Sequence, residues 1–251
     1  MNLYDGRLTF EHPGPLGAVA AALSAACCGG MPFIPKDRRH AREYDEAAYC
    51  EYDLLGFQVG VYRDAAGPFH LDVSASELWR PAWTPDELAS ASYHSCAPWL
   101  AVLLRSLPGF TPQVDPVQAG SPVVVIDSHS LLNARCTFEE ALALFTQKLC
   151  CGLRFVPGET PAGGFALERE LLGHRVVIRP SPWGGGHYLA VTPSPGVVAS
   201  LTAAEKQTLV RLDMTNYLQS LLRDHPWLRG GPSLTPEEVE AYYRPEFEAG
   251  S

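Results

Sequence analysis

Short motifs recur in the same order in the two halves of this 251-residue chain, and this repetition restricts the fold more than any other feature. The motif Cys-Cys-Gly begins at Cys27 and again at Cys150. The motif Leu-x-x-Leu-Leu-Arg-x-x-Pro begins at Leu100 and again at Leu218. Four further matches are Phe33-Ile34-Pro35 with Phe155-Val156-Pro157, Leu54-Leu55-Gly56 with Leu171-Leu172-Gly173, Leu71 and Val73 with Leu189 and Val191, and Thr84 and Glu87 with Thr202 and Glu205. Chance matches would not keep a nearly constant spacing along a whole unit, so we predict a tandem duplication.

The sequence pattern predicts the same series of helices and strands in each copy. A short strand opens the copy, at Leu8–Phe10 and at Val123–Ile126, and an amphipathic or Ala-rich helix follows. About four antiparallel strands come next. A long helix then begins at a capping box, which starts at Thr84 in one copy and at Thr202 in the other. The sequence therefore predicts an α+β fold in which a strand–helix–antiparallel strands–helix unit, present twice, forms a two-lobed protein with a pseudo-twofold axis.

The predicted boundaries follow from these matches. Copy one is residues 1–108, a Pro- and Gly-rich linker is 109–122, copy two is 123–228, and 229–251 is a tail with a short helix. We expect Gly56 and Gly173 to occupy equivalent positions in the two copies.

Charge and hydropathy narrow the classes of partner. The formal net charge is −9, which disfavours nucleic acid and anionic membranes and favours a basic partner. The first ten residues show no basic stretch followed by an apolar one, and no apolar run approaches the roughly 20 residues that cross a bilayer. We therefore expect a cytoplasmic protein that binds neither membranes nor nucleic acid.

The seven cysteines show no metal-binding pattern, because no Cys-x-x-Cys pair is present. Cys27, Cys28, Cys150 and Cys151 follow the first helix of each copy. We expect them to be reduced and packed near the helix ends, since an unpaired cysteine behaves as a small apolar residue. Neither a metal nor a cofactor is predicted.

An insertion in copy one, residues 36–53, is rich in acids and tyrosines after residue 42. Such a composition suits docking to a basic protein, because tyrosine adds contact area and acids attract the partner. Two tryptophans before the capping box at Thr84 could extend this surface. The predicted partner-binding residues are Glu43, Tyr44, Asp45, Glu46, Tyr49, Glu51, Tyr52, Trp79 and Trp83.

One alternative is a hydrolase. The string Gly184-Gly185-Gly186-His187-Tyr188 resembles the Gly-His-aromatic strand that holds the catalytic histidine of papain-like bacterial peptidases. That resemblance implies a nucleophilic cysteine at a helix start, a place that only Cys136 fits. The leading interpretation makes His187 non-catalytic and its side chain farther than about 4 Å from that of Cys136.

Two further patterns are interpreted without an active site. The tetrapeptide Asp127-Ser128-His129-Ser130 predicts a polar turn after a buried strand, because a hydrolytic triad is assembled from distant segments. The predicted topology looks like that of the TATA-binding-protein pseudo-dimer, but the acidity of this chain opposes binding to DNA. The leading functional hypothesis is a non-catalytic protein that binds another protein, such as an immunity protein that neutralises a toxin or an adaptor. The alternatives are the Cys136/His187 hydrolase and a structural subunit that oligomerises through its exposed sheet face.

Overall fold

The computed structural model describes most of the first 222 residues of the chain. The described residues are 1–35, 46–63, 67–76, 83–113, 120–132, 136–150, 152–157, 165–167, 170–181 and 186–222. The structure falls into a first half, residues 1–113, and a second half, residues 120–222.

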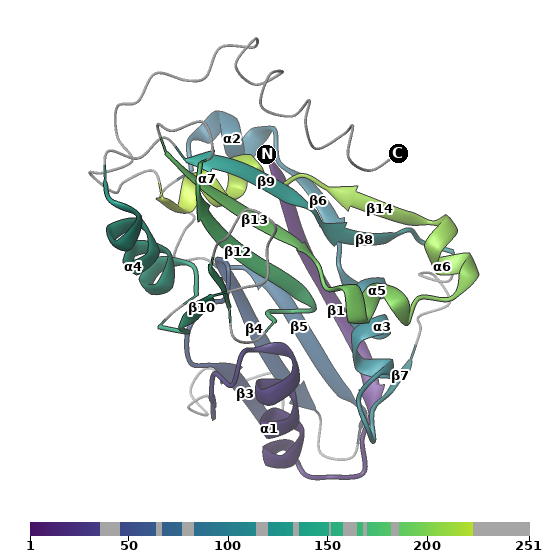
Figure 1. Cartoon of the computed structure of the whole chain (residues 1–251). Coiled ribbons are helices and arrows are strands. Elements are labelled where there is room, and N and C mark those ends of the chain that lie inside the picture. The colour runs from purple at the N-terminus through teal and green to yellow at the C-terminus, as the bar shows by residue number, and fades with distance from the viewer. Residues whose placement is uncertain are drawn as a thin grey trace.

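The described residues of the first half form a mixed sheet and three helices. Its elements are β1 (Asn2–Glu11), α1 (Leu16–Cys27), β2 (Phe33–Pro35), β3 (Glu46–Cys50), β4 (Phe57–Arg63), β5 (Phe69–Ala75), α2 (Pro85–Ala89), β6 (Ser92–Ser95), α3 (Ala97–Arg105) and β7 (Thr111–Gln113). The strand order is β2-β3-β4-β5-β1-β6, and β7 pairs with β1 from within the predicted linker. Figure 1 shows β1 as the long strand through the middle of the molecule.

The second half repeats most of this order. Its elements are β8 (Val123–Ile126), β9 (Ser128–Leu132), α4 (Phe138–Lys148), β10 (Phe155–Pro157), β11 (Phe165–Leu167), β12 (His174–Pro180), β13 (His187–Pro193), α5 (Pro195–Ala199), α6 (Ala203–Gln207), β14 (Leu209–Leu212) and α7 (Thr215–Leu222). Five strands form a sheet in the order β10-β11-β12-β13-β9, and β14 pairs with β8. Helices and mostly antiparallel strands in both halves confirm the α+β class.

The prediction of a long helix after each capping box is wrong. Both capping boxes form, at Thr84 and at Thr202, but α2 and α6 end after five residues. Neither helix buries any residue, so nothing in the core favours a longer one. The chain instead enters a short parallel strand, β6 against β1 and β14 against β8, before α3 and α7 begin.

The strands that open the two halves do not match each other in the way that the sequence predicts. The parallel ladders pair Asn2 of β1 with Ser92 and Val123 of β8 with Leu209, so β8 matches the beginning of β1 and not Leu8–Phe10. The later part of β1 is matched by β9, which pairs with β13 as β1 pairs with β5. Asp127, between β8 and β9, is one extra residue that breaks the strand in two.

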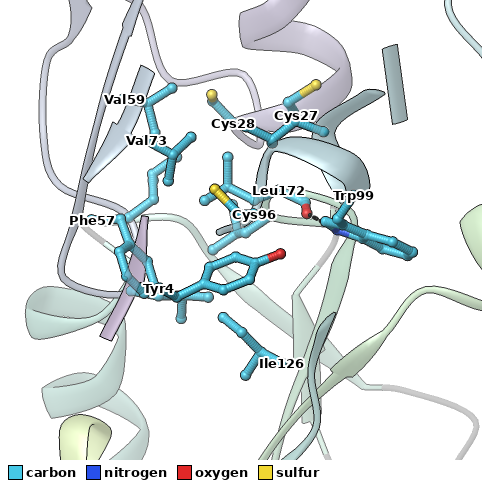
Figure 2. Close-up of a cluster of buried hydrophobic side chains, with 14 of the residues drawn as sticks. Tyr4, Cys27, Cys28, Phe57, Val59, Val73, Cys96, Trp99, Ile126 and Leu172 are labelled. Atoms are coloured by element: carbon cyan, nitrogen blue, oxygen red, sulfur yellow. Dashed lines mark hydrogen bonds between the residues drawn. The ribbon is translucent and has the colours of Figure 1, made fainter. Parts of the chain in front are cut away.

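One hydrophobic core joins the halves. It combines α1, β4 and β5 of the first half with α4, β12 and β13 of the second. Figure 2 shows side chains of both halves in one cluster, among them Tyr4, Phe57 and Trp99 with Ile126 and Leu172. The Tyr4 hydroxyl donates to the Val124 carbonyl at 3.0 Å, so it is satisfied within this core. The two predicted lobes therefore share their interior.

Each half has a Leu-Gly turn in the left-handed conformation. The φ angles are 54° at Leu55 and 78° at Gly56, and 50° at Leu172 and 75° at Gly173. A left-handed leucine is strained, so the surrounding structure must hold each turn. Both turns stand directly before a central strand, β4 or β12.

Backbone hydrogen bonds between the halves hold these turns. The Leu55 N–H donates to the Leu149 carbonyl, and the Leu172 N–H donates to the Cys27 carbonyl, both at 2.7 Å. In each case the acceptor lies at the C-terminal end of the helix of the other half, where carbonyls lack a partner within the helix. Each turn thus completes a helix end across the junction.

A buried aromatic side chain reaches each turn from the other half. The Trp99 indole on α3 donates to the Leu172 carbonyl at 2.9 Å, as Figure 2 shows. The Tyr217 hydroxyl on α7 donates to the Gly56 carbonyl at 2.8 Å. Trp99 of the first half thus contacts the turn of the second half, and Tyr217 of the second half contacts the turn of the first. Gly56 and Gly173 therefore have matching surroundings.

Candidate functional site

The predicted docking segment lies only partly within the described residues. Glu43, Tyr44, Asp45 and Trp79 lie outside them. Glu46 and Tyr49 lie on β3, while Glu51 and Tyr52 follow it directly.

The described part forms one edge of the first sheet, where β2 is the outermost strand. We call the surface formed by Ile34, Glu46, Tyr49, Glu51 and Tyr52 the β2–β3 edge. Ile34 is 50% exposed and Tyr52 is 53% exposed, and Glu51 is also exposed. These positions place apolar and acidic side chains together on an accessible edge.

Two of these residues are partly engaged inside the protein. Glu46 accepts a 2.7 Å hydrogen bond from Arg63, its neighbour across the β3–β4 ladder. The Tyr49 ring lies over Gly60, where a Cβ atom would come within 2.7 Å of the ring. Tyr52 is more exposed than Tyr49, whereas Glu51 and Glu46 are both exposed.

Trp83 does not belong to this surface. It is buried, and its indole donates to the Ser220 hydroxyl at 3.0 Å, which ties the start of α2 to α7. A tryptophan that buries its ring and satisfies its N–H inside the fold has little left for a partner.

The separation predicted for Cys136 and His187 is wrong. The Cys136 Sγ lies 3.7 Å from the His187 Nε2, within the 4 Å expected of a resting Cys–His pair. Cys136 stands just before α4, and His187 opens β13. The packing of α4 beside its sheet brings these residues together, which their separation in sequence does not indicate.

The electrostatics of the pair favour an unreactive thiol. Burial and the nearby Glu140 carboxylate raise the pKa of the Cys136 thiol, whereas a nucleophilic cysteine needs a lowered one. The His187 Nε2 also lies 3.0 Å from the Cys136 carbonyl oxygen. Among the described residues the His187 Nδ1 has no hydrogen-bond partner, so the proton belongs on Nε2, where an acceptor exists. That tautomer cannot take a proton from the thiol, and no third group of the described chain orients the ring from Nδ1.

The described cysteines near the helix ends agree with the prediction. Cys27, Cys28 and Cys150 are unbridged and buried, and Cys151 lies outside the described residues. Burial raises the pKa of the Cys27 thiol to about 12, so the neutral form packs in the core.

The sequence prediction missed a polar network on the outer face of the second sheet. His129 hydrogen-bonds to Tyr188 through Nδ1, and its Nε2 lies 3.2 Å from the Asp127 carboxylate. Asp127 also accepts from Arg211 at 2.5 Å, and these hydrogen bonds lower its pKa. The predicted polar turn is thus wrong after Asp127, because residues 128–132 form β9. Apolar and polar residues do not alternate here, since residues 127–130 are all polar, so that pattern could not predict the strand.

Neither a metal centre nor a membrane span is found among the described residues. That part of the chain contains no group of three His, Cys, Asp or Glu side chains suited to a metal ion. Within it, no helix is both long enough and apolar enough to span a bilayer. No family model, curated protein or solved structure matches this chain.

Proposed function

We propose that this chain is a non-catalytic binding protein that docks a basic protein partner at the β2–β3 edge. An immunity protein that neutralises a toxin, or an adaptor, would act in this way. The observation that supports the proposal is the pairing of half-exposed Ile34 and Tyr52 with the exposed Glu51 on one sheet edge.

The physical argument has two parts. Burial of an aliphatic and an aromatic side chain supplies affinity, about 25 cal/mol per Å² of apolar surface removed from water. Acidic side chains around them attract a basic partner and raise the association rate more than the affinity. The acidic net charge of the whole chain acts in the same direction.

The experiment separates docking from folding. Ile34→Ser and Tyr52→Ala should each weaken capture of the partner at least tenfold, because each removes a central apolar contact. The matched control is Val156→Ser, since Val156 occupies the same place on β10 and is 36% exposed. Partners captured from the native source by the wild type would be measured against each variant by surface plasmon resonance. Equal binding by all three variants would remove this edge from the interface.

Charge is tested separately. A Glu51→Lys variant should slow association, and raised salt should slow the wild type in the same way. The dissociation rate should change little. An association rate that ignores both changes would contradict a basic partner at this edge.

We also propose that the two halves arose by duplication of one unit and are related by a pseudo-twofold axis through the core that they share. The matching hydrogen bonds of Leu55 and Leu172, together with the ordered sequence matches, support this proposal. It bears on function because the β2–β3 edge belongs to one half only. The predicted insertion is only partly extra, because β3 is a paired strand of the first sheet and β11 takes the matching place in the second. Residues 158–170 of the second half contain no tyrosine, so the tyrosines of the β2–β3 edge distinguish the two halves.

A second candidate function is hydrolysis by Cys136 with His187 as its base, and the 3.7 Å contact favours it. Such a thiol would react with iodoacetamide at pH 7 much faster than a cysteine of ordinary pKa, and His187→Gln would abolish the excess rate. The raised pKa of the Cys136 thiol predicts slow alkylation in both proteins. Fast alkylation that depends on His187 would favour the hydrolase over the binding protein.

A further inference from the structure

A pocket lies where the two halves meet, far in sequence from the β2–β3 edge. Its volume is about 500 Å³, within the usual range for small-molecule sites. We call it the junction pocket, and its lining residues used below are Leu8, Ala101, Arg105, Phe110, Glu205 and Thr208. It takes walls from α3 of the first half and α6 of the second, which the ion pair of Arg105 with Glu205 connects.

The floor of the pocket is apolar. Leu8, Ala101 and Phe110 face it, and each is almost fully buried in the fold. The Phe110 ring is fixed by Phe10, with ring centroids 5.3 Å apart. A preformed apolar floor favours an apolar ligand, because binding needs little rearrangement of the protein.

The rim carries one ion pair, which decides the charge of the ligand. Arg105 donates two hydrogen bonds to Glu205, at 3.0 and 2.9 Å, so the pair is neutral overall. Glu205 also accepts from the Thr202 backbone at 2.7 Å, which leaves it little further accepting capacity. Arg105 uses two of its five N–H donors in the pair and keeps donors for another acceptor.

We propose that the junction pocket binds an uncharged small molecule with an apolar body and a carbonyl or ether oxygen. The apolar body lies on the floor formed by Leu8, Ala101 and Phe110. The oxygen accepts a hydrogen bond from Arg105, which Glu205 holds in place. A carboxylate ligand is disfavoured because it would stand next to Glu205, and a cation because it would meet Arg105. This activity is independent of partner docking at the β2–β3 edge.

The probe is prodan, an uncharged naphthalene ketone whose fluorescence shifts to the blue in apolar surroundings. We expect saturable binding of one molecule per chain with a blue shift. The anionic dye anilinonaphthalene sulfonate should bind at least tenfold more weakly. Absence of saturable prodan binding, or tighter binding of the anionic dye, would overturn the proposal.

Variants locate the probe. Thr208→Trp, on the exposed rim, should weaken prodan binding at least tenfold by covering the pocket. Ala101→Phe should do the same by filling the floor. Ala21→Trp, at an exposed position of α1, is the matched control and should bind as the wild type does. Arg105→Met keeps the apolar stem but removes the donors, and should lose about tenfold.

Thr208→Trp keeps the test valid if Ala101→Phe fails to fold, as monitored by circular dichroism. Folded Thr208→Trp that binds prodan like the wild type would place the dye elsewhere and refute the junction pocket.

Discussion

The two halves agree where they meet and differ where they face outward. At the junction, each Leu-Gly turn donates a backbone hydrogen bond to a helix end of the other half. On the outer faces, the strand registers place Tyr62 and His70 of the first half where the second half has Arg179 and Tyr188. Contacts that hold the molecule together restrict the sequence at the junction, whereas the outer faces are able to diverge. Function is therefore to be sought in the differences between the halves.

The largest expected effect comes from the glycines of the two turns. Gly56→Ala would place a Cβ 2.6 Å from Leu221 and 2.7 Å from the Tyr217 hydroxyl, at a φ of 78°. Gly173→Ala would meet the Trp99 ring at 3.1 Å, a milder contact. We expect losses in the free energy of unfolding of about 3 and about 2 kcal/mol, measured by urea denaturation.

Gly17 supplies the control for both substitutions. It lies in α1, and a Cβ there would meet nothing within 4 Å, so Gly17→Ala should be neutral or slightly stabilising. A Gly173→Ala variant as stable as Gly17→Ala would break the correspondence between the two turns.

The next prediction concerns how the stability of the protein depends on pH. It rests on one position at which the two halves carry different residues. His174, at the start of β12, stands where the first half has Phe57 at the start of β4. Burial lowers the pKa of His174 to about 4, below the value of about 6.5 in an unfolded chain. Since the unfolded chain then binds the proton first, stability is full above about pH 6.5 and falls by up to about 3 kcal/mol towards pH 4.

Replacement of His174 by phenylalanine should flatten this dependence. The variant also loses the acceptor for the Ile126 N–H, now bonded at 3.1 Å, so it should be about 1–3 kcal/mol less stable at pH 7. Urea denaturation at pH 7, 5.5 and 4.5 measures both effects. The lowered pKa of Asp127 acts below about pH 4, outside this window. An unchanged slope between pH 7 and 4.5 would refute the assignment to His174.

Removal of the two aromatic hydrogen bonds to the turns should lower the stability of the protein by different amounts. Gly56 O keeps a second donor, the Ser76 N–H at 3.0 Å, so Tyr217→Phe should cost only about 1 kcal/mol. Trp99→Phe removes the indole that donates to Leu172 O and also leaves a cavity, so we expect about 3 kcal/mol. Thermal unfolding of the two variants would show this order. The reverse order would contradict this prediction, because it would show that the Ser76 N–H does not compensate at Gly56 O for the lost hydroxyl.

The smallest loss of stability is expected from removal of a capping box, and it should be equal in the two halves. Thr84→Ala and Thr202→Ala each remove a capping box from a short exposed helix, at a cost of about 1 kcal/mol. Serine at either position should restore the loss, since its hydroxyl can accept the same N–H. Chemical denaturation would compare the four variants. A large loss at one position only would show that α2 and α6 are not equivalent supports for β6 and β14.

Much of the architecture was determined by the sequence itself. The recurrent motifs aligned Gly56 with Gly173, and local spacing located the capping boxes at Thr84 and Thr202. These features are local, because a cap or a turn depends on a few neighbouring residues. For the same reason, the sequence predicted the amphipathic helix of the second copy, which the structure shows as α4.

Only the tertiary structure decided which distant segments touch. It merged the predicted lobes into one core, turned the predicted long helices into short helices and parallel strands, and brought Cys136 to His187. It also buried Trp83, which the sequence predicts to lie on the partner-binding surface. Such contacts follow from how faces of several elements pack together, and this packing depends on the whole chain at once, so no local pattern records it.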